Sequence, residues 1–349
     1  MNQSNPQSST GKVNVAVVGL GFMGVTHLRA YLQVPAARIV AVCDAVRLPV
    51  NGVLQGVAGN IKKSDDIDLG QQVKVFRKLE EVLAEPEVQL VDLCTPTPLH
   101  PEQAIAALQA GKHVLCEKPL ARTSAAARDI VEAERSAAGF IMPAMCLRFW
   151  PGWSWLKQVV AEQRYGKILA ARFWRMSAMP TWSKQGTYTG SSNIGGALFD
   201  LHIHDVDFIQ FLFGLPARVF STGVSAPDGS IDHVVTQYLF PGGPTVYAEG
   251  GWLLAGGFNM AYTLLCERAT LDFDLARGAN AMQITEPGQP TRVVTYDGPD
   301  GYGEEVRYAV QCALEGKPPA VVTAQDGFRA LQICEAEEKS IKTGQVVTL

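Results

Sequence analysis

A short apolar segment that runs straight into a glycine-rich turn narrows the possible folds of this chain more than any other feature. Residues 13–18 (Val-Asn-Val-Ala-Val-Val) have the composition of a buried parallel strand. Gly19, Gly21 and Gly24 then occupy the three glycine positions of G-x-G-x-x-G. These glycines turn the chain, let the backbone approach a pyrophosphate and allow a helix to pack closely on the strand. The stretch therefore predicts a dinucleotide-binding unit of strand, turn and helix.

An acidic residue at the end of the next apolar run bears on the choice of dinucleotide. Residues 39–43 read as a second strand, and Asp44 follows it 20 residues after Gly24. A carboxylate at this place accepts a hydrogen bond from the ribose 2′-hydroxyl of NAD and repels the 2′-phosphate of NADP. Arg47 lies three residues further on and leaves NADP open as the less favoured cofactor. The alternative is a glycine turn without a ligand and an ordinary loop carboxylate.

The order of strands and helices predicts two different halves. Between residues 13 and 144, strands and helices alternate, which is typical of a doubly wound parallel sheet. After Arg148, strand candidates separated by Gly and Pro turns predominate. The expected fold is thus α/β followed by α+β, with a large open, mainly antiparallel sheet. The helices expected in the second half are residues 153–163, 197–213, 303–315 and 324–342.

These patterns also suggest domain limits and an assembly. We expect a disordered polar tail at residues 1–11, a Rossmann domain at 12–146, and a substrate and oligomerisation domain at 147–349. An open antiparallel sheet commonly buries its second face on a partner. A homodimer or homotetramer formed through this sheet is therefore expected.

Composition excludes several classes of function. The 349 residues carry a net charge of −4, so no basic excess is available for nucleic acid or anionic membranes. No apolar run approaches the ~18 residues of a membrane span. The seven cysteines are odd in number and lack C-x-x-C spacing, which favours a reducing, cytoplasmic setting. Cys and His do not cluster at ligand spacing, so no metal site is expected.

Two loops with polar residues directly follow predicted strands of the first half. Residues 94–100 (Cys-Thr-Pro-Thr-Pro-Leu-His) follow one strand and residues 116–120 (Cys-Glu-Lys-Pro-Leu) follow another. Loops at the carboxyl ends of parallel strands are where such sheets bind ligands. A lysine at such a position is more often a solvated loop residue than a functional one, and this is the alternative for Lys118. The alternative for His100 is a cap of the following helix.

A third polar stretch lies in the second half, at residues 195–207. On a helix, Asp200 and His204 are four residues apart and share a face. A carboxylate beside an imidazole fixes its tautomer and stabilises its protonated form, as a general acid/base requires. An ordinary helix with an Asp–His pair is the alternative. Metal binding by His202, His204, Asp205 and Asp207 is disfavoured because the two histidines diverge on a helix.

Taken together, the three stretches resemble the glucose–fructose oxidoreductase/inositol dehydrogenase/MocA (Gfo/Idh/MocA) family. The resemblance runs from Val13 to Leu349 and rests on an ordered set of motifs. These are the glycine loop, Thr95-Pro96 with His100, Glu117-Lys118-Pro119, and Gly195-Gly196 with Asp200, His204 and Asp207. Any one of them is a modest signal, whereas the ordered set is specific.

The resemblance implies a role for each motif. His204 would take the hydroxyl proton, Lys118 would reach the substrate hydroxyl, and Asp200 would orient the imidazole or bind a neighbouring hydroxyl. Glu117 would lie near the nicotinamide ribose, and the Lys118–Pro119 bond is often cis in the family. The implied catalytic residues are Lys118, Asp200 and His204. The implied cofactor-binding residues are Gly19, Gly21, Phe22, Met23, Gly24, Asp44, Thr95, Pro96, His100, Glu117 and Lys118.

The resemblance implies an NAD(P)-dependent oxidoreductase acting on a secondary hydroxyl of a sugar, cyclitol or related polyol. Arg148, at the junction of the halves, joins Lys118, Asp200 and His204 as an expected substrate contact. Four further side chains lead towards the Asp200 helix and suit a sugar-binding wall, or else belong to the core or an interface: Trp174, Arg175, Trp182 and Tyr188. A non-catalytic NAD(P)-binding regulator and an NAD-dependent, redox-assisted glycosidase are the alternative functions.

Overall fold

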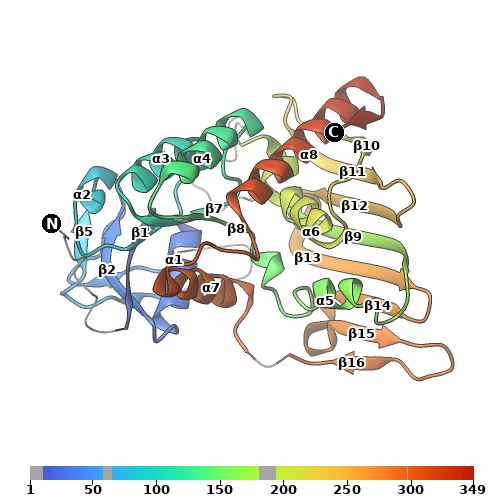
Figure 1. Ribbon diagram of the computed structural model, residues 1–349, viewed down its shortest axis with the longest axis horizontal. Helices are drawn as coiled ribbons and strands as arrows, with labels where there is room; N and C mark the ends of the chain where they lie inside the picture. The colour runs from blue at the N-terminus through green and yellow to red at the C-terminus, as the bar shows by residue number, and fades with distance from the viewer. Residues whose placement is uncertain (1–10, 58–64, 181–193, 297) are drawn as a thin grey trace.

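The structure, a computed structural model, describes residues 11–57, 65–180, 194–296 and 298–349. Residues 1–10 of the predicted tail (1–11) and the residues Trp182 and Tyr188 lie outside the described residues. In the described part, two large sheets lie side by side, each with helices packed on it (Figure 1).

Six parallel strands form the first sheet, in the order β5-β2-β1-β6-β7-β8. Its strands are β1 (Val13–Val18), β2 (Ala37–Cys43), β5 (Lys74–Phe76), β6 (Leu90–Leu93), β7 (His113–Glu117) and β8 (Ile141–Ala144). The helices of this half are α1 (Phe22–Leu32), α2 (Leu79–Leu83), α3 (His100–Gln109) and α4 (Ser124–Ser136). Two short strands, β3 (Val53–Leu54) and β4 (Ile67–Asp68), pair separately. This is the predicted doubly wound arrangement.

The central strands are buried on both faces, as their Val- and Leu-rich composition predicts. Helix α7 (Gly301–Glu315) from the end of the chain packs beside α1 on one face of the sheet (Figure 1). On the other face, α3 packs against α4, and α4 contacts α8 (Ala324–Thr343). The last two helices therefore return to the first half, and the predicted domain limits at 146 and 147 stay a prediction.

Nine strands form the second sheet, in the order β16-β15-β14-β13-β9-β12-β11-β10-β17. Only β9 and β12 run parallel among neighbours in this described sheet, so its mainly antiparallel character is confirmed. Its strands are β9 (Ile168–Ala178), β10 (Arg218–Ser225), β11 (Ile231–Leu239), β12 (Thr245–Gly251), β13 (Leu253–Cys266), β14 (Thr270–Asp274), β15 (Met282–Thr285), β16 (Arg292–Val294) and β17 (Val347–Thr348).

Helices α5 (Leu156–Ala161), α6 (Ile203–Phe213) and α8 cover one face of this sheet. Trp153 lies at the centre of the packing, with Phe173, Phe208 and Tyr262 around its ring. The pairs of Trp153 with Phe208 and Tyr262 are edge-to-face, and such pairs add to the free energy gained by burying aromatic surface.

One predicted helix has a different form. The stretch expected as a single helix over 197–213 begins with a π-helical turn at Leu198–His202, and α6 starts only at Ile203. The other expected helices of this half lie within three residues of their predicted limits, α5 being the shortened one. The π-turn matters because it contains Asp200.

Candidate active site

The glycine loop has the geometry that a pyrophosphate site requires. Gly19 has φ of +90°, and a Cβ on it would lie 2.5 Å from the carbonyl oxygen of Cys94. A Cβ on Gly24 would lie 1.9 Å from the carbonyl oxygen of Gly19, so helix and loop pack without room for a side chain. By contrast, no heavy atom lies within 4 Å of a Cβ built on Gly21.

The start of α1 is open to an anion for the same reason. Gly21 is the N-cap residue and provides no side-chain hydrogen bond, and no acidic residue lies in the first turn. The free N–H groups of a helix start, in front of the open space at Gly21, are where Rossmann sheets bind pyrophosphate. The residues present therefore fit the diphosphate of NAD, with Phe22 and Met23 in the first helical turn.

Asp44 lies beside this loop, at the end of β2. Its Oδ2 accepts a hydrogen bond from the backbone N–H of Leu20 at 2.7 Å, and its Oδ1 accepts from the N–H groups of Val46 and Arg47. The carboxylate is thus fixed to the glycine loop, with further lone pairs available to a ribose hydroxyl. The guanidinium of Arg47 donates to the carbonyl oxygen of Leu20, which holds Arg47 over the same loop.

His100 joins the two loops that follow β6 and β7. The ring is 1% exposed, with Nδ1 2.8 Å from the carbonyl oxygen of Pro119 and Nε2 2.7 Å from that of Thr95. Burial lowers the pKa of His100, although both carbonyl contacts oppose the change. Both ring nitrogens face backbone oxygens, so the structure places His100 between the loops. Its direct contact with the cofactor, and those of Thr95 and Pro96, stay predictions.

Lys118 crosses from the first half of the molecule to the second. Its Nζ donates to the backbone oxygen of Asp200 at 2.6 Å and to Oδ1 of Asp200 at 3.0 Å. Burial by itself lowers the pKa of Lys118, but the carboxylates of Asp200 and Glu117 outweigh it and raise the pKa above its usual value. The ammonium is therefore held charged at the junction. The Lys118–Pro119 bond is cis, as the family resemblance implies.

Asp200 is committed to Lys118 rather than to His204. Asp200 lies in the π-helical turn that precedes α6. The expected pairing of Asp200 with His204 assumes a regular α-helix, in which residues four apart share a face. Among the described residues, Nδ1 of His204 is buried without a hydrogen-bond partner. The expectation that Asp200 orients the imidazole is thus not met in this arrangement, although π-turns of this kind are frequent at functional sites.

The surroundings of His204 favour the neutral form of its imidazole. Burial is the main reason why its pKa lies well below the usual value, and the cations of Lys118 and Arg175 lower it further. A neutral imidazole is ready to accept a proton over the whole physiological range.

Two buried arginines hold α6 in place through ion pairs. Arg175 comes from the second sheet, and Arg148 comes from the junction of the two halves. Arg148 donates from Nη2 to Oδ1 of Asp207 at 2.6 Å and from Nη1 to Asp326 at 3.3 Å. Arg175 donates from Nε to Oδ2 of Asp205 at 2.8 Å. With its side chain 3% exposed, Arg148 is in contact with protein groups in this structure, and its role as a substrate contact stays a prediction.

The remaining candidates of the second half lie elsewhere. Phe173 and Arg175 are buried beneath α6, so the intervening Trp174 points to the opposite face of β9 and cannot line a cleft with Asp200. His202 is fully buried, 3.1 Å from the hydroxyl of Tyr238. Asp205 and Asp207 are paired with arginines, so these three are structural residues.

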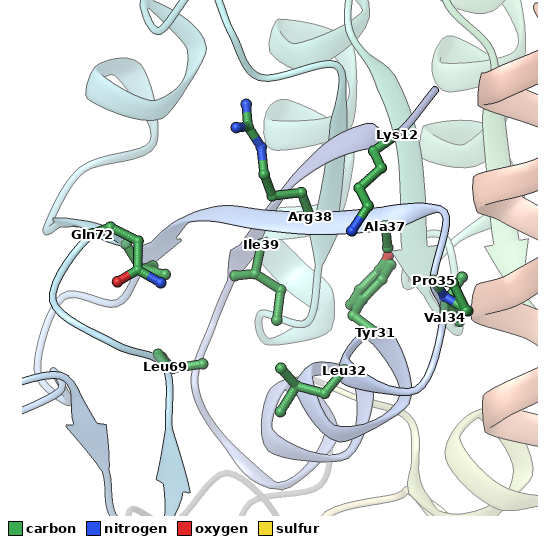
Figure 2. Close-up of a pocket in the computed structure, with 11 residues that line it drawn as sticks. Lys12, Tyr31, Leu32, Val34, Pro35, Ala37, Arg38, Ile39, Leu69 and Gln72 are labelled. Carbon is green, nitrogen blue, oxygen red and sulfur yellow. The ribbon is translucent and has the colours of Figure 1, made fainter. Parts of the chain in front are cut away.

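A cavity in Figure 2 lies far from these groups along the sheet. Its wall includes Lys12, Val34 and Arg38, which precede or begin β1 and β2. It therefore opens at the amino ends of the strands, whereas the glycine loop, Asp44 and Lys118 follow their carboxyl ends. Ligands of doubly wound sheets bind at the carboxyl ends.

Three buried titratable side chains near the site were not singled out from the sequence: His27, Asp92 and Glu305. All three are fully buried, and His27 lies 2.9 Å from Asp92. In the sequence, the one feature that could have indicated them is a titratable side chain at a position where the pattern of a helix or strand calls for an apolar residue. Cys94 completes the only His/Cys/acid group within ligand distance in the described residues. Because these side chains hydrogen-bond one another, we interpret the group as a hydrogen-bond network.

Comparisons with known proteins agree with this geometry. Residues 13–144 match the family described as oxidoreductase family, NAD-binding Rossmann fold, and residues 153–272 match the Gfo/Idh/MocA C-terminal domain.

Among the described helices, none has the length and apolar character needed to cross a membrane.

Relatives over most of the chain are named dehydrogenases and reductases. A myo-inositol 2-dehydrogenase of Thermotoga maritima is 25% identical, over 97% of this chain and 98% of its own. A 1,5-anhydro-D-fructose reductase of Ensifer adhaerens is 28% identical, over 79% and 84%. The fold is shared with a levoglucosan dehydrogenase in complex with NADH and levoglucosan, at a TM-score of 0.81 and 20% identity, over 97% of this chain and 99% of the other. The chain therefore belongs to the Gfo/Idh/MocA family of NAD-binding oxidoreductases.

Proposed function

We propose that this protein transfers a hydride between NAD and a carbon that bears a secondary hydroxyl in a sugar, cyclitol or related polyol. The main support is the contact of the Lys118 ammonium with Asp200 across the junction, close to a neutral His204. A neutral imidazole can accept the hydroxyl proton and a cation can stabilise the developing alkoxide, which are two of the tasks in alcohol oxidation. Relatives named for inositol, anhydrofructose and levoglucosan support the substrate class.

Bound NAD supplies the hydride acceptor. His204 accepts the hydroxyl proton as the hydride leaves the same carbon, so a carbonyl forms and charge balances. Lys118 stabilises the negative charge that develops on the oxygen, and Asp200 holds the ammonium in place through its carboxylate and its backbone oxygen. In the reducing direction, the imidazolium of His204 returns the proton.

The test is a screen of polyols, cyclitols and aldoses with NAD and NADP, followed by the absorbance of the reduced nicotinamide. We expect turnover with at least one compound and higher kcat/KM with NAD than with NADP. Tight NADH binding without turnover of any compound would indicate the regulator instead. Release of an aglycone from a glycoside with no net absorbance change would indicate the redox-assisted glycosidase.

We further propose a homodimer or homotetramer formed through the second sheet. In the described part of the chain, no element covers the face opposite α6, and this face carries Trp174 and the exposed Tyr247. Light scattering of the wild type and of Tyr247→Glu tests this proposal. We expect the variant to dissociate, and a monomeric wild type would contradict it.

The compartment is the last part of the proposal. All seven cysteines are free, which supports a reducing, cytoplasmic location.

A further inference from the structure

One histidine outside the proposed catalytic set lies in a fully buried, charged cluster. His27 is on α1, three residues after Gly24, and its side chain has no exposed surface. Its Nδ1 is 2.9 Å from Oδ2 of Asp92 on β6. Its Nε2 is 3.3 Å from Oε1 of Glu117, at the end of the neighbouring strand β7, an ion-pair contact without hydrogen-bond geometry. The imidazole thus lies between carboxylates of two adjacent central strands, hydrogen-bonded to Asp92 and within ion-pair distance of Glu117.

A third carboxyl group reaches this ring from the other end of the chain. Glu305 is on α7, which packs beside α1, and its Oε1 is 4.0 Å from Nε2 of His27 (Figure 1 shows the two helices). Neither of its carboxyl oxygens has a hydrogen-bond partner among the described residues, although the side chain is fully buried. A buried carboxylate without a partner is strongly destabilised, so Glu305 is expected to be neutral.

The charges around the ring can be assigned from this geometry. Burial lowers the pKa of His27, but Asp92 outweighs it with help from Cys94, and the pKa lies well above its usual value. Burial raises the pKa of Glu305 well above its usual value. For Glu117, burial is outweighed by His27 and then Lys118, so its pKa is lowered. Other titratable groups that face the cluster are the phenols of Tyr31 and Tyr302 and the thiols of Cys116 and Cys146, all of which burial keeps neutral.

The cluster connects directly to the proposed catalytic lysine. Glu117 accepts a hydrogen bond at Oε2 from the backbone N–H of Lys118, at 3.0 Å. The other oxygen of the same carboxylate faces His27. A single carboxylate therefore lies between the buried ring and the residue whose Nζ binds Asp200.

We propose that His27, as a buried imidazolium, is a positioning residue that holds the Glu117 carboxylate ionised and oriented and thereby fixes Lys118 at the reacting hydroxyl. This role rests on the proposed function of Lys118, whereas the charge state of the ring does not. Glu305 is the neutral neighbour that completes the burial of the ring without adding a further negative charge.

The charge state can be tested without turnover, by NMR of ¹⁵N-labelled imidazoles in the wild-type protein. The chain has six histidines, and His27→Gln identifies the signals of His27 by their loss. Should that variant not fold, sequence-specific assignment of the wild type serves instead. We expect the His27 ring to remain doubly protonated through pH 7 and above. A neutral ring at pH 7 would overturn the inference, whether or not a substrate is known.

The positioning role is tested by kinetics of His27→Gln, with Glu305→Gln as the matched control. Glutamine keeps the hydrogen-bonding capacity at both sites, but only His27→Gln removes a charge. We expect kcat to fall about tenfold or more in His27→Gln, because small misplacements of a reacting group are costly. The acid limb of its kcat profile should move to higher pH, because Glu117 loses the cation that keeps it ionised. Glu305→Gln should leave both properties unchanged.

Stability gives a further readout with a defined sign. The raised pKa of His27 means that its protonation stabilises the folded state fully below the ordinary histidine pKa, and this contribution is lost as the pH rises through the raised value. The difference in unfolding free energy between wild type and His27→Gln should therefore narrow at alkaline pH. A folded His27→Gln with wild-type kcat and an unmoved profile would rule out positioning. Absence of turnover in the wild type would count against the proposed function and not against the imidazolium.

Discussion

The glycine loop and helix α6 contribute to one candidate site in opposite ways. The loop works through backbone groups and the absence of side chains, and its three glycines and Asp44 lie within 25 positions of one another in the sequence. Helix α6 works through charged side chains whose partners, Arg148 and Arg175, are 59 and 30 residues away. The glycine loop can therefore be recognised in the sequence as a local motif. The second depends on buried ion pairs that form only when the whole domain has packed.

The largest expected effect is on the chemistry contributed by the second region. His204→Gln should lower kcat by about 10²- to 10⁴-fold, because the variant lacks the base for the hydroxyl proton. NADH affinity, measured by fluorescence titration, should stay close to that of the wild type because the glycine loop is untouched. The control is His233→Gln, on β11, which should retain full activity. A fully active His204→Gln would remove the proposed mechanism.

The ion pairs behind α6 provide the next test. Arg148→Met should destabilise the fold by about 3–5 kcal/mol, because Asp207 is left buried and unpaired. The double variant Arg148→Met/Asp207→Leu should recover much of that loss, as measured by chemical unfolding. The exposed pair of Arg135 and Glu132 offers the comparison, since Arg135→Met should change stability little. A stable Arg148→Met with a raised KM for substrate would instead support Arg148 as a substrate contact.

In the glycine loop, substitutions at two glycines should distinguish an effect on NADH binding from an effect on stability. Gly24→Ala should lower stability by about 1–3 kcal/mol, because its Cβ would lie 1.9 Å from the carbonyl oxygen of Gly19. Gly21→Ala meets no protein atom within 4 Å, so its stability should be unchanged while NADH binding weakens. Thermal unfolding and fluorescence titration distinguish the two. Equal NADH affinity in wild type and Gly21→Ala would move the pyrophosphate away from this loop.

The smallest expected effect is a shift in pH dependence across the junction of the regions. Because the pKa of His204 is lowered, the oxidation rate should stay constant as the pH falls to 6.5 and decline only below it. Lys118→Met removes one of the two cations that lower this pKa, so the acid limb should move to higher pH in the activity that remains. Burial, the larger cause, is unchanged, so the shift should be partial. An unmoved limb would mean that Lys118 and His204 are not electrostatically coupled.

Much of the fold could be predicted because its signals are periodic and local. The βαβ alternation, the strand before Gly19 and the acid at Asp44 each depend on neighbours close in sequence. The motif order also indicates Lys118, Asp200 and His204 as catalytic candidates, and their roles stay predictions. The outward direction of Trp174 was missed because the strand's register relative to α6 is a property of packing.

What the sequence by itself determined is the nature of each half: a dinucleotide-binding sheet with an NAD-type acid, followed by an open antiparallel sheet with an Asp–His helix. Only the tertiary structure decided which charged groups pair. The π-turn at Leu198–His202 accompanies the pairing of Asp200 with Lys118, although a regular helix places Asp200 beside His204. Likewise, His27 and Glu305 meet only because α7 packs back onto α1, 278 residues later. Burial makes every charge dependent on its neighbours, and those neighbours come from distant parts of the chain.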